Sequence, residues 1–418
     1  MTSGNGMADI DLASIKTIEG LDVAGKRVLV RADLNVPVEN GTVADATRIE
    51  RVLPTIEALR KGGAKVVLMS HFGRPKGERS PDTSLKPVAT KLTELLRADV
   101  LFLDDCIGSD VEAGIASIKD GEVALLENLR YHPGETKNDI EFAKQLAALG
   151  DIYVDDAFSC AHRAHASVEA IARLMPAYAG MAMMAEINAL SAALEDPKRP
   201  VVAIVGGAKV STKIEVLTNL AQRMDMIVVG GGMANTFLFA EGTDVGKSLC
   251  EPDFVDTVKE ITEKAKASGC EIVLPVDVVV ADSLAEGVDT SVCGVDEIPA
   301  EALALDWGPK SVAMLIEKLE GAHTILWNGP LGAFEIAPFG AATFALAQEA
   351  GARSKAGKLI SVAGGGDTVR ALNMAGAAEN FTYISTAGGA FLEWLAGEQL
   401  PGVAVLAGDS NPPQSAVA

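Results

Sequence analysis

The stretch VVAIVGGAKVSTK, Val201 to Lys213, places an apolar run directly before two glycines and two lysines. An apolar run without alternation is typical of a strand buried on both faces, as in a parallel sheet. The following residues are expected to begin a helix, where free backbone N–H groups disfavour the cations Lys209 and Lys213 by roughly 0.3 to 1 kcal/mol each. A bound anion reverses that cost, because glycines let a phosphate approach the backbone. The stretch therefore predicts a phosphate site; two solvated lysines on an ordinary helix are the alternative.

The same pattern of strand, glycines and helix recurs in the second half of the chain. It appears as DMIVVGGGMANTFLFA at Asp225 to Ala240, KLISVAGGGDTVRAL at Lys358 to Leu372 and YISTAGGAFLEW at Tyr383 to Trp394. In parallel α/β sheets, ligands bind at the carboxyl ends of the strands. Several glycine-lined turns at that edge predict a nucleotide site.

Strands in the first half end in charged and polar residues instead. They are predicted at Arg27 to Ala32, Lys65 to Met69, Val123 to Leu126 and Ile152 to Val154, as four consecutive strands. Their carboxyl ends share one edge of a parallel sheet, so the residues after them should converge. Those residues are Asp33, Asn35, His71, Arg74, Asn128, Arg130, Asp155, Asp156, His162, Arg163 and His165, with Arg48 in the helix after the first strand. Arginine forks match phosphate and carboxylate oxygens in pairs, which predicts a pocket for a small phosphorylated acid.

Composition limits the classes of protein that fit. A length of 418 residues exceeds what one hydrophobic core usually organises and predicts two domains. The 57 acidic residues outnumber the 36 basic ones, and the net charge of −21 argues against nucleic acid or an anionic membrane as partner. Anionic ligands would therefore require the basic residues to be concentrated at their site. Five cysteines without CxxC spacing suggest neither a disulfide framework nor a zinc site, and they fit a reducing cytosol.

Targeting and membrane segments are not expected. The first residues, MTSGNGMADI, lack the basic segment and apolar core of a signal peptide. The longest apolar stretch, Leu174 to Ala185, is too short to span a bilayer. It is interpreted as a buried segment between the domains, leading into a helix over Met184 to Leu194.

Other site types fit these residues less well. His162 and His165 resemble a metal pair, but no third ligand of the usual kind is nearby, which argues against zinc. Residues 242–248, GTDVGKS, resemble a P-loop with a spacer one residue short, and they follow a helix instead of a strand. No GxGxxG motif opens the first βαβ unit, which counts against a dehydrogenase. Asp367 also fits a plain helix N-cap, and Glu335 an exposed loop acid.

Eight blocks of the sequence resemble the signature motifs of the phosphoglycerate kinase family, in the order of that family. They span about residues 16 to 403. The blocks are GKRVLVRADLNVP (Gly25 to Pro37), SHFGRP (Ser70 to Pro75), LLENLRYHPGE (Leu125 to Glu135), AHRAHAS (Ala161 to Ser167), GGAKVSTK (Gly206 to Lys213), GGGMA (Gly230 to Ala234), WNGPLGAFE (Trp327 to Glu335) and GGGDT (Gly364 to Thr368).

The resemblance implies an α/β fold with two Rossmann-like domains, each a parallel sheet flanked by helices, facing an inter-domain cleft. It implies a phosphoglycerate-binding domain at 1–183, a nucleotide-binding domain at 184–395 with 184–196 as an inter-domain helix, and a segment 396–418 that packs back on the first domain. The implied activity is reversible phosphoryl transfer between 1,3-bisphosphoglycerate and ADP, with Mg²⁺, by a cytoplasmic, hinge-bending monomer. No nucleic acid or membrane partner is implied.

Site residues follow from the matched motifs. The resemblance implies that Lys209, Arg48 and the Gly365 and Gly366 amides stabilise the transferring phosphoryl group, and that Asp367 holds the metal. The implied substrate residues are Asp33, Asn35, Arg48, His71, Arg74, Arg130 and Arg163. The implied nucleotide residues are Gly207, Lys213, Gly231, Asn328, Pro330, Glu335, Gly365, Gly366, Asp367 and Thr368.

A few residues depart from the family pattern. Leu34 stands where Phe is common, Ser159 and Cys160 where Gly and Thr are common, and Ala387 where the last glycine turn usually starts with Gly. Those beside the substrate pocket are expected to have mild effects. Two other classes stay open: a non-catalytic two-domain sugar-phosphate binding protein, which ADP-dependent turnover would exclude, and a dehydrogenase, which would require nicotinamide binding.

Overall fold

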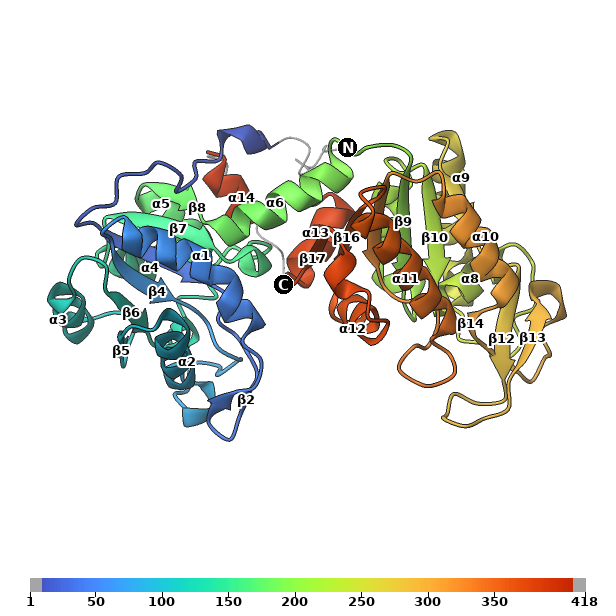
Figure 1. Ribbon diagram of the computed structural model, residues 1–418, viewed down its shortest axis with the longest axis horizontal. Coiled ribbons are helices and arrows are strands. Elements are labelled where there is room, and N and C mark those ends of the chain that lie inside the picture. Colours follow the sequence, from blue (N-terminus) through green and yellow to red (C-terminus); the bar gives the residue numbers. More distant parts are fainter. Residues whose placement is uncertain (1–9, 409–418) are drawn as a thin grey trace. The chain divides into compact units, whose positions relative to one another are not determined.

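The computed structural model describes residues 10–408, which divide into two compact units (Figure 1). The first unit runs to Ile187 and takes up the chain again at Glu398, and the second comprises Asn188–Gly397. Of the segment 396–418, residues 409–418 lie outside the described range. Within that range, no helix combines the length and the apolar character needed to cross a membrane.

A six-stranded parallel sheet, in the order β5-β6-β4-β1-β7-β8, forms the centre of the first unit. Its strands are β1 Arg27–Ala32, β4 Lys65–Met69, β5 Val100–Leu103, β6 Val123–Leu126, β7 Ile152–Asp156 and β8 Ala177–Ala179. The four predicted strands are confirmed, and they are neighbours in the sheet. They are not consecutive in the chain, since β5, an edge strand that was not predicted, lies between β4 and β6. The hairpin β2 Val38–Glu39 and β3 Thr42–Val43 lies outside this sheet.

Helices cover both faces of this sheet, which explains its unbroken apolar strands. Val28 and Val30 of β1 pack into one cluster with residues of α1 and α2. Leu29, between them, points to the other face and packs with residues of α3, α4, α5 and α14. The helices are α1 Thr47–Lys61, α2 Lys86–Leu96, α3 Ser109–Ser117, α4 Ile140–Ala147, α5 Ile171–Leu174 and α14 Pro401–Leu406.

The helix α6, Met181–Leu194, carries the chain from the first unit into the second. It begins at Met181 and not at the predicted Met184. Side chains distant in sequence satisfy its first N–H groups: the Thr55 hydroxyl accepts from Met181 N at 2.9 Å, and Asp156 Oδ1 accepts from Met183 N at 3.0 Å. The stretch Leu174 to Ala185 was expected to be buried, but Leu174 is 38% and Met181 49% exposed.

The second unit contains a parallel sheet in the order β11-β10-β9-β15-β16-β17. Its strands are β9 Val201–Gly206, β10 Met226–Gly230, β11 Glu271–Val273, β15 Thr324–Asn328, β16 Ile360–Gly364 and β17 Tyr383–Ser385. Numbered along the chain, this is the 3-2-1-4-5-6 order of the Rossmann fold, whose switch point lies between the first and fourth strands. Here β9 and β15 flank that point.

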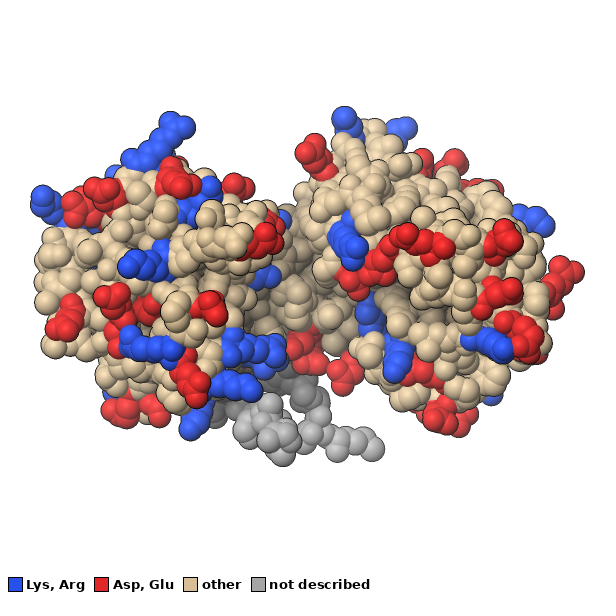
Figure 2. Space-filling model, turned by 90° about the horizontal axis from the view of Figure 1, so that it is seen from below, with Lys and Arg blue, Asp and Glu red and all other residues tan. Residues whose placement is uncertain are grey.

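Seven helices and a small sheet complete the described part of the second unit. Val202 and Ile204 of β9 pack with residues of α10, α11 and α12 on one face. The helices are α7 Ile214–Leu220, α8 Gly232–Ala240, α9 Val255–Ala267, α10 Pro309–Leu319, α11 Ala341–Lys355, α12 Gly366–Met374 and α13 Gly389–Ala396. The antiparallel strands β12 Asp277–Ala281, β13 Ser291–Gly294 and β14 Leu303–Trp307 were not predicted. On the face in Figure 2, acidic and basic side chains are interspersed over both units.

Candidate functional site

Asp33 lies at the centre of a hydrogen-bonded group at the carboxyl edge of the first sheet, directly after β1. Its Oδ2 accepts from Ser159 Oγ at 2.6 Å and lies 3.0 Å from Arg48 Nη1. Arg48 Nη1 also donates to the Asn35 carbonyl at 3.0 Å, and Asn35 Oδ1 accepts from Gly73 N at 2.9 Å. The structure thus brings these predicted residues together, and it adds Ser159, one of the departures from the family pattern.

Three further predicted arginines follow strands of the first unit, with Arg130 in the 3₁₀ helix Leu129–Tyr131. Arg130 is half-buried: its Nη1 donates to the Gly73 carbonyl at 2.8 Å, while its buried Nε has no hydrogen-bond partner among residues 10–408. Arg163 is exposed, and its Nε donates to His162 Nε2 at 3.2 Å. The exposed Arg74 guanidinium makes no hydrogen bond or ion pair within the described part of the chain. Arg130 is therefore tied to the Asp33 group, whereas Arg74 and Arg163 are exposed cations.

Arg31, in β1, was not predicted as a site residue although it is fully buried at this edge. Its Nε donates to Ser167 Oγ at 2.9 Å, and its Nη2 lies 3.1 Å from His71 Nδ1. Burial, and then the charge of Arg31, holds the pKa of His71 well below its usual value. The ring is therefore neutral near pH 7, and its Nδ1 accepts from the guanidinium. One charge inside the apolar run VLVRA was the signal available in the sequence.

Lys213 Nζ in the second unit is bound to the ends of two strands. It donates to the carbonyls of Gly206 at 2.6 Å and Asn328 at 3.1 Å, and also to Asn328 Oδ1. Burial lowers the pKa of Lys213 to about 8, and the Asp367 carboxylate opposes that shift. Three oxygen acceptors thus offset the cost of placing this cation at a helix start.

Lys209 does not share that helix start, so the expectation of one helix carrying both lysines is wrong. A 3₁₀ helix, Val210–Thr212, separates them, and α7 begins after Lys213. Lys209 is exposed, and its ammonium makes no hydrogen bond or ion pair within the described residues. It is thus available to an anion. Lys247, in the P-loop-like segment, follows the helix α8 and not a strand, which disagrees with a P-loop, and its ammonium pairs with Glu301.

The turns after β9, β10 and β15 approach one another so closely that they require glycine. A Cβ on Gly206 would lie 1.8 Å from the Pro330 carbonyl oxygen, and one on Gly329 would lie 2.1 Å from the Gly206 carbonyl oxygen. Gly231 has a φ of +67°, and a Cβ there would lie 2.6 Å from the Gly207 carbonyl oxygen. Backbone therefore packs directly against backbone at the switch point. Gly206 and Gly329 are buried in these contacts, whereas Gly207 and Gly231 are partly exposed.

The start of α12 adjoins these turns. Its N-cap residue is Gly365, with a φ of 97°, and the helix begins at Gly366. Asp367 is therefore the second helical residue, and its interpretation as the N-cap is wrong. Thr368 Oγ1 accepts from Gly329 N at 2.7 Å, which holds α12 against the turn after β15. Free backbone N–H groups and one exposed carboxylate lie at the same helix end.

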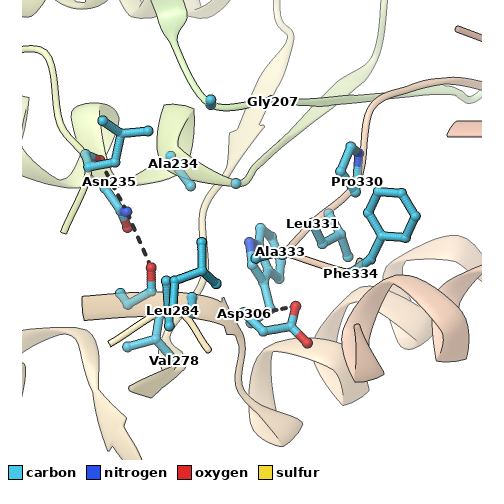
Figure 3. A pocket seen from close by; sticks show the side chains of 18 of the residues that line it. Gly207, Ala234, Asn235, Val278, Leu284, Asp306, Pro330, Leu331, Ala333 and Phe334 are labelled. Carbon is cyan, nitrogen blue, oxygen red and sulfur yellow. Dashed lines mark hydrogen bonds between the residues drawn. The ribbon is translucent and has the colours of Figure 1, made fainter. Parts of the chain in front are cut away.

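A cavity of about 310 Å³ opens beside the glycine turns. The predicted residues among those that line it are Gly207, Gly231, Pro330, Glu335 and Asp367. Figure 3 shows Val278 and Leu284 facing it from below, with Pro330 and Phe334 at the side. This apolar wall was not predicted, because part of it comes from the antiparallel sheet. A concave apolar wall with a polar edge is typical of a small-molecule site.

Besides Asp367, two further acids line this cavity, in different ways. Glu335 Oε1 lies 3.8 Å from Arg370 Nη1, and its side chain is 45% exposed. Asp306 is buried, which raises its pKa to about 7, and it accepts from Trp307 N at 2.9 Å and Ala342 N at 3.0 Å. Asp306 therefore joins β14 to α11, whereas Glu335 is exposed to a ligand.

The fold and the two sites define a class: an α/β protein of two parallel-sheet units, with a basic strand edge on one and a glycine-lined cavity on the other. A family model described as phosphoglycerate kinase matches residues 18–398. The chain belongs to the phosphoglycerate kinase family.

Relatives and solved structures agree with that membership. The phosphoglycerate kinase of Rhizobium meliloti (strain 1021) is 61% identical over 394 residues, covering 94% of this chain and 99% of its own. That of Caulobacter vibrioides (strain NA1000 / CB15N) is 57% identical over 393 residues, covering 94% and 99%. The Coxiella burnetii phosphoglycerate kinase structure has a TM-score of 0.89 at 42% identity, covering 95% of this chain and 100% of its own. The Pyrococcus horikoshii OT3 structure has a TM-score of 0.77 at 32% identity, with the same coverage.

Proposed function

We propose that this chain catalyses the reversible transfer of the acyl phosphate of 1,3-bisphosphoglycerate to ADP, giving 3-phosphoglycerate and ATP, in glycolysis and gluconeogenesis. Membership of the family over nearly the whole chain carries the proposal. A coupled assay for ATP formation from 1,3-bisphosphoglycerate by the purified full chain tests it. Binding of both ligands without ADP-dependent turnover would favour the non-catalytic alternative instead.

The first unit is assigned to 3-phosphoglycerate. Arg74, Arg130 and Arg163 supply the cations for its phosphate, because planar guanidinium groups pair with phosphate oxygens. Asp33 and Asn35 are the hydroxyl acceptors. The full assigned set is Asp33, Asn35, Arg48, His71, Arg74, Arg130 and Arg163. Arg31 is a positioning residue here: it holds the neutral His71 ring by a 3.1 Å contact.

The second unit is assigned to the nucleotide. Its apolar cavity suits a base, and the N–H groups at the start of α12 suit the phosphates, which helix N-termini bind. The assigned residues are Gly207, Lys213, Gly231, Asn328, Pro330, Glu335, Gly365, Gly366, Asp367 and Thr368. Lys213 adds a positive charge at the end of β9, where its Nζ donates to the Gly206 carbonyl at 2.6 Å.

The reaction needs alignment and positive charge more than proton transfer. In the direction of ATP consumption, the acceptor carboxylate is already ionised at neutral pH, so no general base is required. Arg48 and Lys209 are assigned to the equatorial oxygens of the transferring group, together with the amides of Gly365 and Gly366. Arg48 is already oriented by Asp33, whereas Lys209 is exposed with no ion pair in the described residues.

Asp367 fits the expected Mg²⁺. Its carboxylate is exposed at the cavity and forms no hydrogen bond or ion pair within residues 10–408. Mg²⁺ favours hard oxygen ligands and is commonly held by one or two carboxylates with substrate phosphates. When bound there, the ion would neutralise charge on the phosphate oxygens.

The two sites belong to different units, so transfer requires the units to come together around both substrates. We assign the bending to α6, because it is the helix that crosses the boundary at Ile187. A monomeric, cytoplasmic enzyme without nucleic acid or membrane partners completes the proposal. Sedimentation analysis checks the monomer.

Arg74→Ala is expected to raise the KM for 3-phosphoglycerate at least about tenfold, since charge-assisted hydrogen bonds contribute on the order of 1.5 to 3 kcal/mol each. The KM for ATP should change little. Steady-state kinetics with each substrate varied in turn measures both constants. Arg97→Ala removes another exposed guanidinium of the same unit and serves as the control. An equal or larger effect of Arg74→Ala on ATP would show that the two sites are assigned to the wrong units.

The lowered pKa of Lys213 predicts that kcat/KM for nucleotide depends on pH. Its pKa is lowered to about 8, so the free enzyme loses this charge as the pH rises through about 8. The kcat/KM for nucleotide reports the free enzyme and should therefore fall above that pH. In Lys213→Gln the constant should be low and without this inflection. An unchanged inflection in Lys213→Gln would assign the titration to another group.

A further inference from the structure

A cluster of Asp105, Cys106 and His132 lies in the first unit, apart from the residues assigned above. Asp105 and Cys106 follow β5, and His132 follows the 3₁₀ helix Leu129–Tyr131. One potential ligand atom from each residue lies within 4.8 Å of the other two, in the only such group of three among the described residues. His132 Nε2 lies 2.6 Å from Asp105 Oδ1. Two distant segments thus bring a thiol, an imidazole and a carboxylate together.

Cysteine spacing alone suggested no zinc site, but the fold brings Cys106 to ligands that are not cysteines. We propose that Asp105, Cys106 and His132 bind Zn²⁺, with water as the fourth ligand. Sulfur, imidazole nitrogen and carboxylate oxygen are the zinc donors of proteins, and three protein ligands with one open position form a common tetrahedral arrangement. A thiolate and an imidazole together favour Zn²⁺ over Mg²⁺ or Ca²⁺. The proposal does not depend on the assignment of the substrates.

The surroundings of the cluster fit an ion of this size. Zinc bonds of about 2.0 to 2.3 Å place tetrahedral ligand atoms roughly 3.4 Å apart. The ion would replace the proton shared by His132 and Asp105, and that pair would open slightly while the thiol moves closer. The His132 ring is already fixed by stacking on Phe142, with ring centroids 5.3 Å apart. Cys106 N donates to Asp105 Oδ1 at 2.7 Å, which orients the carboxylate.

An ion can reach the cluster from solvent, and zinc binding displaces protons from its ligands. Cys106 is fully buried, but the side chains of Asp105 and His132 are 34% and 26% exposed, so an ion can enter past them. Binding forms Zn–S and Zn–N bonds: the thiol proton is released to solvent, and the Nε2 proton of neutral His132 is exchanged through solvent for one on Nδ1, so that Nε2 can bind the ion. Burial opposes that step, because it raises the pKa of Cys106 well above its usual value.

Arg79 allows a prediction of increased zinc affinity. Its guanidinium pairs with Asp105 Oδ2 and lies 5.4 Å from the centre of the Tyr131 ring. A cation on Asp105 repels a second cation, so Arg79 should weaken zinc binding. Removing Arg79 should therefore tighten it. An ordinary structural hydrogen bond between Asp105 and His132 predicts no such gain.

The test is calorimetric titration of the metal-free full chain with zinc chloride. The wild type should bind one Zn²⁺, and Cys106→Ser and His132→Gln should each bind it at least about tenfold more weakly. Arg79→Gln should bind it several times more tightly. Cys293→Ser, which changes a partly buried cysteine of the second unit, should leave binding unchanged.

Three results would overturn the proposal: no zinc bound by the wild type, equal binding by Cys106→Ser, or a loss in Cys293→Ser as large as that in Cys106→Ser. Thermal unfolding without metal shows whether each variant is folded. If Cys106→Ser does not fold, the absorption spectra of the wild type and His132→Gln with Co²⁺ in place of Zn²⁺ test the site. A thiolate-to-cobalt charge-transfer band and intense four-coordinate d–d bands in the wild type alone would support the site, and their absence would refute it.

Discussion

Lys209→Ala is expected to lower kcat by about a hundredfold or more, while nucleotide affinity changes little. One lost charge contact made mainly in the transition state contributes on the order of 2.7 to 4 kcal/mol. The structure sharpens this expectation, because Lys209 is exposed beside the glycine turn and has no ion pair within the described residues. Its removal should therefore cost the fold little. Initial rates at saturating substrates give kcat, and a nucleotide binding titration gives the affinity.

The control for this variant is Lys259→Ala, which removes an exposed lysine of α9 in the same unit. It separates the loss of one positive charge from the loss of this particular ammonium group. Near-normal kcat in Lys209→Ala, with an unchanged melting temperature, would refute the catalytic assignment. A fall in kcat in both variants would point to the overall charge of the unit.

Asp367→Asn is expected to abolish most activity at ordinary magnesium concentrations and to regain part of it when magnesium is raised. The substitution removes an anionic oxygen ligand of the kind that Mg²⁺ prefers. Because Asp367 is the second residue of α12 and not its N-cap, the folded state loses only a favourable interaction with the helix dipole, about 0.3 to 1 kcal/mol. The measurement is a magnesium titration of activity for wild type and variant.

Asp256→Asn is a closely matched control. Asp256 is also exposed and is the second residue of a helix in the same unit, α9. Asp256→Asn removes a carboxylate from the first turn of α9, which directly follows the 3₁₀ helix Pro252–Phe254, without a neighbouring glycine turn. Similar melting temperatures for the two variants, with magnesium-dependent activity affected only in Asp367→Asn, are expected. Superimposable magnesium curves for Asp367→Asn and wild type would mean that another residue holds the metal.

Strands buried on both faces were predictable, because their apolar runs are unbroken. β1, β4, β6 and β9 are examples, and polar residues or glycines mark where they end. The edge strand β5 was missed although its four apolar residues VLFL match the length of β6; in the sheet it is partly exposed, whereas β6 is buried. The antiparallel sheet of β12 to β14 was missed as well, and with it the apolar wall that Val278 adds to the cavity.

Local sequence could not reveal groups whose roles depend on distant partners. Arg31 bonds to His71 and Ser167, which lie 40 and 136 positions away in the chain. Asn328, 115 positions from Lys213, supplies two of the oxygens that hold that ammonium group. Lys213 was predicted to be destabilised at a helix start unless an anion binds, but the carbonyls of Gly206 and Asn328 already stabilise it. Long-range hydrogen bonds of this kind leave no periodic pattern in the sequence.

The second unit is inserted into the first, because the chain leaves the first unit after Ile187 and returns to it at Glu398. The returning helix α14 supplies Val405 to the core of the first unit, and Gly402 N donates to the Ala161 carbonyl at 2.9 Å. During synthesis on the ribosome, the unit that emerges first is thus the last to have all its residues. Domains generally fold in the order in which they are synthesised. Here the first unit lacks the partner of the Ala161 carbonyl until Gly402 has been synthesised, after the whole second unit.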